Sequence, residues 1–200
     1  EDIRGRHQKS GYGERFLNKI QKWNNDRPVS SEQPCKDSTA DTASLLALSK
    51  QIWRTVIPQM EVLRPGWHTY LRKTLVPLYD FCQSDTELTE IYAAFAHDYS
   101  DWTVHEEQLL LYWIYTYFCG AVYDDQIFAK VKMAVICTFM IHELAAGTWL
   151  KNDRHFTFED MISICYRFSR ELEHSDPNLN EMERLMDEED VFDFRNLLTI

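Results

Sequence analysis

Glycine is scarce in this chain, where it accounts for six of the 200 residues. The sequence contains no Gly-x-Gly-x-x-Gly motif, no Walker phosphate loop and no Gly-x-Ser-x-Gly motif. These motifs form the phosphate-binding loops of α/β nucleotide-binding proteins and the nucleophile turn of α/β-hydrolases. Their absence excludes the usual α/β sites for a nucleotide-like cofactor and for serine catalysis.

Positive charge is also in short supply. The 21 lysines and arginines are outnumbered by 32 aspartates and glutamates, which gives a formal net charge of −11. Nucleic acids and anionic membranes are bound through clustered basic residues, because their phosphates must be neutralised. We therefore expect neither a nucleic acid nor a membrane as partner, whereas a protein partner is compatible with an acidic chain.

Cysteine is sparse, and no two cysteines have the Cys-x-x-Cys spacing. Four of the five lie in apolar segments with a helical pattern, namely Cys82, Cys119, Cys137 and Cys165, and the fifth is Cys35. This distribution indicates reduced, buried cysteines in a cytosolic protein, and neither a disulfide framework nor a cysteine-only metal site.

Long apolar runs are absent as well. The most apolar window covers residues 131–141 and is too short to cross a bilayer. The first residues, Glu1-Asp-Ile-Arg, lack the apolar region of a signal peptide. We expect a cytoplasmic protein.

Helical periodicity extends along most of the chain, and no useful length of sequence alternates as a strand would. We predict an all-α fold, an orthogonal or antiparallel bundle of about six to eight helices. Residues 1–23 are predicted to form an N-terminal helical segment. Residues 24–41, polar and with two prolines, are predicted to be a flexible linker, and residues 42–200 the bundle domain.

Capping patterns place several helix starts. Residues Ser84–Glu87 and Thr103–Glu106 are predicted capping boxes that open helices over 85–99 and 104–120. The second of these contains a segment, residues 109–118, that is apolar or aromatic nearly all round, so we predict that it lies at the centre of the bundle. Other helices are predicted over 42–57 and 66–82, over a segment that carries 131–149 and is capped by Asp124 or Asp125, and after Pro177.

The clearest helical signal is in residues 156–179. Thr157 is the predicted N-cap, and an apolar stripe recurs at three- and four-residue spacing. The stripe consists of Met161, Ile164, Cys165, Phe168 and Leu172. A second, ionisable side is predicted to carry Arg167, Arg170, Glu171 and His174.

Glu171 and His174 have the Glu-x-x-His spacing of di-iron bundle proteins. Such a site needs a second Glu-x-x-His pair, and the sequence has none, so no metal site is predicted. A histidine beside a carboxylate can titrate near neutral pH, which makes this pair a candidate for acid–base catalysis. The alternative is a solvated helix side held by ion pairs.

Four tyrosines cluster in the sequence between residues 112 and 123: Tyr112, Tyr115, Tyr117 and Tyr123. Aromatic faces attract ammonium groups, so these tyrosines could line a pocket for a lysine side chain. The alternative is ordinary aromatic packing in the core.

Five segments resemble, in the same order, segments of the C-terminal region of the flagellin lysine-N-methylase family. They are residues 60–71, 105–118, 121–135, 156–179 and 191–198, and the similarity covers residues 42–200. The segment Phe168-Ser-Arg-Glu-Leu-Glu-His-Ser-Asp-Pro-Asn-Leu179 carries the strongest likeness.

The resemblance implies methylation of lysine ε-amines on flagellin or another protein, with S-adenosylmethionine as methyl donor. A lysine ammonium, with a pKa of about 10.4, must lose a proton before it is methylated. We expect Glu171, His174 or Tyr117 to assist that step as catalytic residues, and Tyr112, Tyr115 and Tyr123 to bind the substrate. The resemblance itself transfers no catalytic residue, and the cofactor contacts and oligomeric state stay open.

Members of the family also carry an N-terminal cysteine-rich region that is thought to hold an iron–sulfur cluster. Here Cys35 stands alone and no initiator methionine is present. We therefore expect these residues to be the C-terminal part of a longer protein, with a cluster only in the longer form. The alternatives are a non-catalytic acidic module that positions a protein partner, and a helical small-molecule-binding domain.

Overall fold

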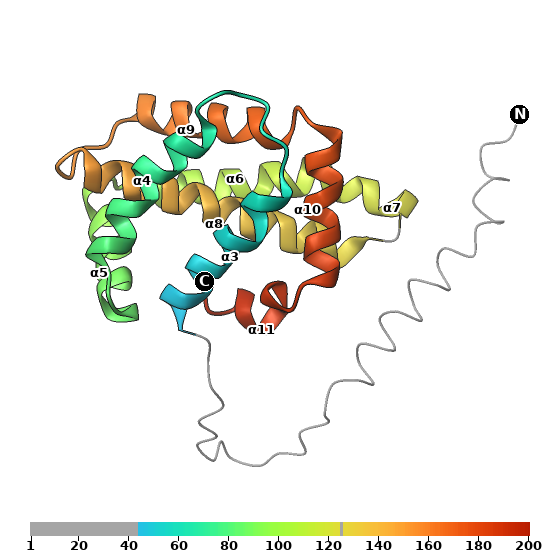
Figure 1. The fold of residues 1–200 in the computed structure, drawn as a ribbon, viewed down its shortest axis with the longest axis horizontal. Helices are drawn as coiled ribbons and strands as arrows, with labels where there is room; N and C mark the ends of the chain where they lie inside the picture. The colour runs from blue at the N-terminus through green and yellow to red at the C-terminus, as the bar shows by residue number, and fades with distance from the viewer. Residues whose placement is uncertain (1–43, 125) are drawn as a thin grey trace, which may run out of the picture.

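The computed structural model describes residues 44–124 and 126–200, and every regular element in those ranges is helical (Figure 1). The all-α prediction is confirmed. The predicted N-terminal helical segment, residues 1–23, and the predicted linker, residues 24–41, lie outside the described residues.

The elements follow one another with short connections. In chain order they are α3 (Leu45–Val56), η1 (Ile57–Gln59), α4 (Trp67–Phe81), α5 (Asp85–Asp98), α6 (Trp102–Tyr117), η2 (Phe118–Gly120), α7 (Ala121–Asp124), α8 (Ile127–Lys151), α9 (Phe158–Leu172), α10 (Asp176–Glu188), η3 (Asp190–Phe192) and α11 (Phe194–Leu197).

The central element is α8, which packs against α4, α5, α6, α9, α10 and α11 (Figure 1). The prediction that residues 109–118 form the central helix is wrong. In α6 only Trp102 and Trp113 are buried, whereas buried residues lie on every side of α8. The alanines of α8 and its Gly147 explain the difference, because small side chains let neighbouring helices approach closely.

Helices α8 and α4 approach each other closely at Gly147. A β-carbon added to Gly147 would lie 2.6 Å from the backbone oxygen of Thr74, so only glycine fits there. Thr74 is itself fully buried. This contact fixes the separation of the two helices.

Local capping signals predicted some helix starts and not others. Thr157 accepts a hydrogen bond from the amide of Asp160, whose carboxylate accepts from the Thr157 amide, so the expected cap of α9 is a complete capping box. Ser84 caps α5 by accepting a hydrogen bond from the Glu87 amide, but the predicted box is incomplete, because the Glu87 carboxylate accepts from the Gln83 amide instead. The box predicted at Thr103 is wrong, because α6 begins one residue earlier at Trp102 and Thr103 lies inside its first turn.

The cap predicted for the helix that carries residues 131–149 is also absent. That helix, α8, begins at Ile127 after Gln126, with no side-chain cap. Asp124 instead accepts a hydrogen bond from the Gln126 amide and pairs with Lys130 at 2.9 Å.

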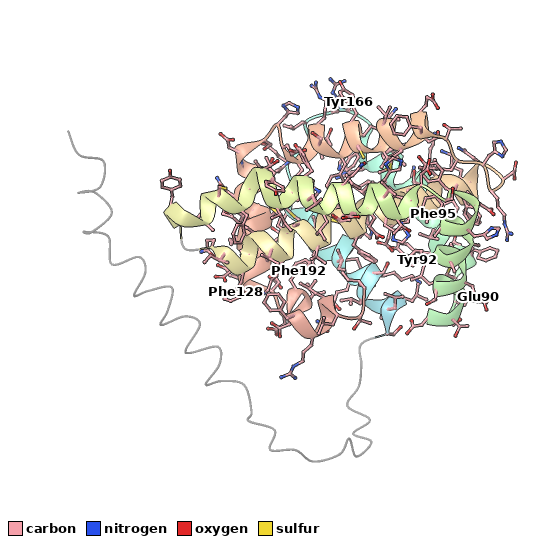
Figure 2. The ribbon with its side chains drawn as sticks, turned by 180° about the vertical axis from the view of Figure 1, so that it is seen from behind. Glu90, Tyr92, Phe95, Phe128, Tyr166 and Phe192 are labelled. Atoms are coloured by element: carbon pink, nitrogen blue, oxygen red, sulfur yellow. The ribbon has the colours of Figure 1, made fainter. Side chains whose placement is uncertain are left out.

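Aromatic rings fill the core on the side of α5. Glu90 lies on the outer side of that helix, whereas Tyr92 and Phe95 lie toward the rest of the bundle (Figure 2). Phe95 is fully buried and packs edge-on against Phe156 and Trp149. None of the described helices has the length and hydrophobicity needed to cross a membrane.

The four cysteines within the described residues are free thiols, and two of them, Cys82 and Cys137, are buried as expected. Cys165 is half-buried and Cys119 is exposed. The expectation of burial is wrong for Cys119, because the chain leaves α6 at η2 and turns that residue to the surface.

Candidate functional site

A groove of about 460 Å³ runs between α6 and α9, and we call it the aromatic groove. Its lining is mainly aromatic and aliphatic: His105, Gln108, Leu109, Tyr112, Trp113, Ile141, Phe158, Met161, Ile162, Cys165, Tyr166, Phe168, Ser169 and Glu173. Glu173 is the one acidic residue in this lining, and Lys and Arg are absent from it.

The Glu173 carboxylate accepts hydrogen bonds from two tyrosines of α6. The Tyr117 hydroxyl donates to its Oε2 at 2.8 Å, and the Tyr112 hydroxyl donates to the same oxygen. The second carboxylate oxygen, Oε1, has no hydrogen-bond donor among the described residues. It is therefore the atom of this group that can receive a ligand.

Both tyrosines remain protonated at neutral pH. Burial, and then the neighbouring Glu173 carboxylate, raise the pKa of Tyr112 to about 12 and raise that of Tyr117 further. Each hydroxyl is consequently a hydrogen-bond donor and not a base. The pair holds the carboxylate in one place at the junction of the two helices.

Aromatic packing makes the walls of the groove rigid. Trp113 stacks on Tyr117 at 5.5 Å between ring centroids and meets the edge of Phe168 at 6.3 Å. At the α6 N-terminal end, His105 stacks on Phe158 at 5.5 Å. The groove therefore offers flat apolar surfaces leading to one carboxylate.

Cys165 does not act as a nucleophile in this groove at neutral pH. Burial raises the pKa of its thiol to about 11, so the thiolate is rare. The Glu173 carboxylate is the acidic group of the groove that is left as a candidate for contact with a ligand.

Two of the predicted site residues, Tyr117 and Tyr112, are brought together by the structure. Tyr115 and Tyr123 are 79% and 92% exposed, respectively, and lie outside the lining of the aromatic groove. The predicted tyrosine cluster is thus divided: one pair binds Glu173 and the other two side chains face solvent.

The structure does not bring Glu171 and His174 together. Glu171 is buried, because it is three residues from Phe168 and seven from Ile164 and so continues the apolar stripe of α9. Its carboxylate accepts a hydrogen bond of 2.9 Å from the Leu63 amide. His174 is exposed in the turn after α9.

Sequence reasoning did not select Glu173 because the predicted helix continued past it. The helix instead ends at Leu172, and Ser175 caps the next helix by accepting a hydrogen bond from the Asn178 amide. A serine just before Asp-Pro was the available signal for a helix start, and it would have placed Glu173 in the turn.

A second carboxylate, Glu143, is fully buried in the middle of α8. It accepts hydrogen bonds from the Trp53 indole at 2.5 Å, the Tyr92 hydroxyl at 2.8 Å and the Tyr79 hydroxyl at 2.9 Å, and from the Ser49 hydroxyl. Burial raises its pKa despite these donors. This carboxylate has no access to a ligand, and its role is to join α3, α4 and α5 to α8.

His142, next in the chain, is enclosed by aromatic rings. Its ring lies 4.5 Å from that of Tyr92 and 4.8 Å from that of Trp102. Burial lowers its pKa to about 4, and burial also raises the pKa of Glu106, whose carboxylate lies 3.7 Å from Nδ1. The contact is therefore not a full ion pair at neutral pH.

A metal ion has no evident ligand set in the part of the chain that the structure describes, where no three His, Cys, Asp or Glu side chains are grouped suitably. The four cysteines in these ranges are free and lie on separate elements, so they do not fit an iron–sulfur cluster.

Comparison with known proteins identifies a family. A protein-family model, the FliB lysine N-methylase C-terminal domain, matches residues 8–200. No curated protein and no solved structure matches the chain. The family match confirms the resemblance seen in five segments of the sequence.

Proposed function

Since the chain belongs to the family of the FliB lysine N-methylase C-terminal domain, we propose that it forms the lysine-binding part of a protein-lysine N-methyltransferase. The proposed substrate is an exposed lysine of a protein, with flagellin as the example that the family name suggests. The observation that carries the proposal is the single carboxylate, Glu173, at the end of an aromatic groove.

A lysine side chain matches this groove in both of its parts. Its aliphatic stem would lie on the aromatic walls formed by Trp113 and Phe168, where apolar contact is favourable. Its ammonium would bind the free Oε1 of Glu173, while the Tyr112 and Tyr117 hydroxyls hold the other oxygen. Charge-assisted hydrogen bonds of this kind are about twice as strong as neutral ones.

The proposed roles of the predicted catalytic residues differ from those expected from the sequence. Tyr117 is a donor with a raised pKa, so it positions Glu173 and does not remove a proton. Glu171 is bound to a backbone amide, and His174 is outside the groove. The apolar walls of the groove lower the pKa of a bound lysine, whereas the Glu173 carboxylate raises it. Glu173 is therefore assigned to binding, and removal of the proton before methylation is assigned to no residue.

S-adenosylmethionine is the proposed methyl donor, and it supplies an electrophilic methyl group on a sulfonium. The groove has one carboxylate, so it fits one cation and does not fit a sulfonium and an ammonium together. We assign that carboxylate to lysine, and no step of the reaction is derived through the donor.

The test is peptide binding to the full chain by isothermal titration calorimetry. A lysine peptide is compared with the same peptide carrying norleucine, which keeps the stem and lacks the charge. We expect the lysine peptide to bind about tenfold more tightly or better, and Glu173→Gln to remove that preference. Glu159→Gln, on the exposed first turn of α9, is the matched control and should change nothing.

Equal binding of the two peptides, or an undiminished preference in Glu173→Gln, would refute the assignment of the groove. Methylation is then measured with the protein that carries the family's cysteine-rich region. Tight peptide binding without methylation would favour the alternative of a non-catalytic acidic module.

A further inference from the structure

A second cavity, of about 380 Å³, lies on the other side of α9, between that helix and the start of α4. We call it the arginine pocket, and its lining is Arg64, Pro65, Gly66, Trp67, Tyr70, Ser163, Tyr166, Arg167, Arg170 and Glu171. Tyr166 borders this pocket and the aromatic groove alike, and it stands on the outer side of α9 (Figure 2).

Three arginines converge on this pocket in a chain whose net charge is −11. Within residues 44–124 and 126–200, none of the three has a carboxylate oxygen within 4.0 Å. Glu171 is present in the lining, but its Oε2 is engaged by the Leu63 amide. The pocket therefore carries excess positive charge that the described residues do not neutralise.

Two of the three arginine side chains are held in place by neutral partners. Arg167 donates to the Ser163 hydroxyl at 3.4 Å and lies 5.1 Å over the Tyr70 ring. Arg170 donates to the Tyr166 hydroxyl at 3.4 Å and lies 5.6 Å over its ring. These contacts orient the guanidinium groups and leave most of their donors available.

One donor is both buried and unused. Arg170 Nε is inaccessible to solvent and has no hydrogen-bond partner in the described structure. A buried donor without a partner is unfavourable, so a small movement of the side chain that brings Nε to an acceptor of a ligand is favoured.

The start of α4 adds to this positive character. Gly66, at φ 96°, is the N-cap of the helix, and no side chain caps it and no acidic residue occupies the first turn. Gly66 and Trp67 line the pocket, so the positive end of the helix dipole lies beside the arginines.

We propose that the arginine pocket is an anion-binding site and that it takes a carboxylate of the molecules that assemble around the lysine in the aromatic groove. The anion site itself is independent of the proposed function. The identity of its ligand, a carboxylate of the molecules around the lysine, rests on that function. Guanidinium groups bind carboxylates through paired hydrogen bonds, which fits the available donors. The carboxylate belongs either to an acidic residue near the lysine in the substrate protein or to the methionine part of the methyl donor.

The first experiment is independent of lysine. Inorganic phosphate is titrated into the full chain, and the ¹H–¹⁵N signal of the Gly66 backbone amide, which lies in the pocket lining, is followed by NMR. We expect a saturable shift that Arg170→Gln abolishes and that Arg72→Gln, an exposed arginine of α4 outside this pocket, leaves intact. A signal that does not move, or a response unchanged in Arg170→Gln, would overturn the anion site.

The second experiment identifies the source of the carboxylate. Each peptide contains one lysine and one aspartate, and the aspartate is placed in turn at each of four positions on either side of the lysine. Every peptide is compared with a version in which asparagine replaces the aspartate. If the substrate supplies the carboxylate, one aspartate peptide binds about tenfold more tightly and Arg170→Gln removes the difference. If the donor supplies it, Arg170→Gln weakens S-adenosylhomocysteine binding about tenfold instead.

The two proposals can fail separately. Loss of the lysine preference with a persistent phosphate response would refute the lysine site and leave the anion site standing. A phosphate response with no effect of Arg170→Gln on any peptide or on S-adenosylhomocysteine would refute the carboxylate assignment.

Discussion

The Tyr117 hydroxyl, near the end of α6, donates a hydrogen bond of 2.8 Å to the Glu173 carboxylate, which lies in the turn that follows α9. The two residues are 56 positions apart in the chain. A tyrosine expected from sequence to take part in catalysis is thus the support of a carboxylate that the sequence did not single out.

Tyr112 should titrate near pH 12, because burial and the adjacent Glu173 carboxylate both disfavour the tyrosinate. In Glu173→Gln its pKa should fall part of the way toward the ordinary value of about 10, since the charge is removed and the burial remains. The measurement is NMR of tyrosine ring carbons as a function of pH. A pKa that does not change in Glu173→Gln would show that the two groups do not interact.

His142 should make the free energy of unfolding decrease as the solution becomes acidic. Its pKa of about 4 in the folded protein is below the unfolded value of about 6.5, so the unfolded chain takes up the proton first as pH falls. Stability supplied by the neutral ring is complete above pH 6.5 and decreases as the pH is lowered toward 4, by about 3 kcal/mol at most.

The measurement for His142 is urea unfolding at several pH values. His142→Phe keeps a ring among Tyr92 and Trp102 and should flatten the acid slope, whereas His97→Gln, at an exposed histidine, should leave it unchanged. An identical slope in wild type and His142→Phe would contradict the assignment.

Glu143 should be among the most sensitive positions in the fold. Glu143→Leu removes the acceptor for Trp53, Tyr79 and Tyr92, and each buried donor left unpaired costs about 1–3 kcal/mol. We expect a loss of at least about 3 kcal/mol by urea unfolding. Glu143→Gln keeps the shape and one acceptor oxygen and should lose less, and equal losses would show that hydrogen bonding is not the cause.

The pH dependence due to Glu143 has the opposite sign to that of His142. Burial raises the folded pKa of Glu143 above its unfolded value, so the folded state holds the proton more tightly. The stability gained in this way is complete below the unfolded pKa, about 4.3, and is lost as pH rises through the folded pKa. Subtraction of the Glu143→Gln profile from that of the wild type should reveal this descending contribution, and a rising difference would refute it.

Gly147→Ala should destabilise the bundle. The added β-carbon would meet the backbone oxygen of Thr74 at 2.6 Å, and separating α4 from α8 costs about 1–3 kcal/mol. Gly120→Ala is the matched control, because its β-carbon would touch only the flexible end of Lys130 at 3.3 Å. Thermal unfolding should show a lower midpoint for Gly147→Ala alone, and two unaffected midpoints would mean that the helices are not in tight contact.

The sequence predicts the parts of this structure that depend on local chemistry. The capping box of Thr157 and Asp160 lies within four residues, and the apolar stripe of α9 follows from helical spacing alone. The hydrophobic pattern does not show whether α6 or α8 is the central helix, because both helices are hydrophobic nearly all round. Small residues such as Gly147, which permit close packing on every side, distinguish α8.

The candidate site is only partly predictable for a similar reason. The tyrosine-rich segment indicates Tyr112 and Tyr117, but their partner depends on where α9 ends. That end is set by Ser175, which begins the next helix, and by tertiary contact with α6. Glu171 stays on the buried side of α9, and only Glu173, beyond the last residue of that helix, meets the two tyrosines.

The buried Glu143 has a consequence for how this domain moves. Helices α3, α4 and α5 each donate a side chain to one carboxylate on α8, so none can detach without stranding a polar group. These four helices should therefore exchange their amide hydrogens as one cooperative unit with the slowest rates. Helices α6 and α9 contribute no donor to that carboxylate among the described side chains, so their amide hydrogens should exchange faster than those of this unit.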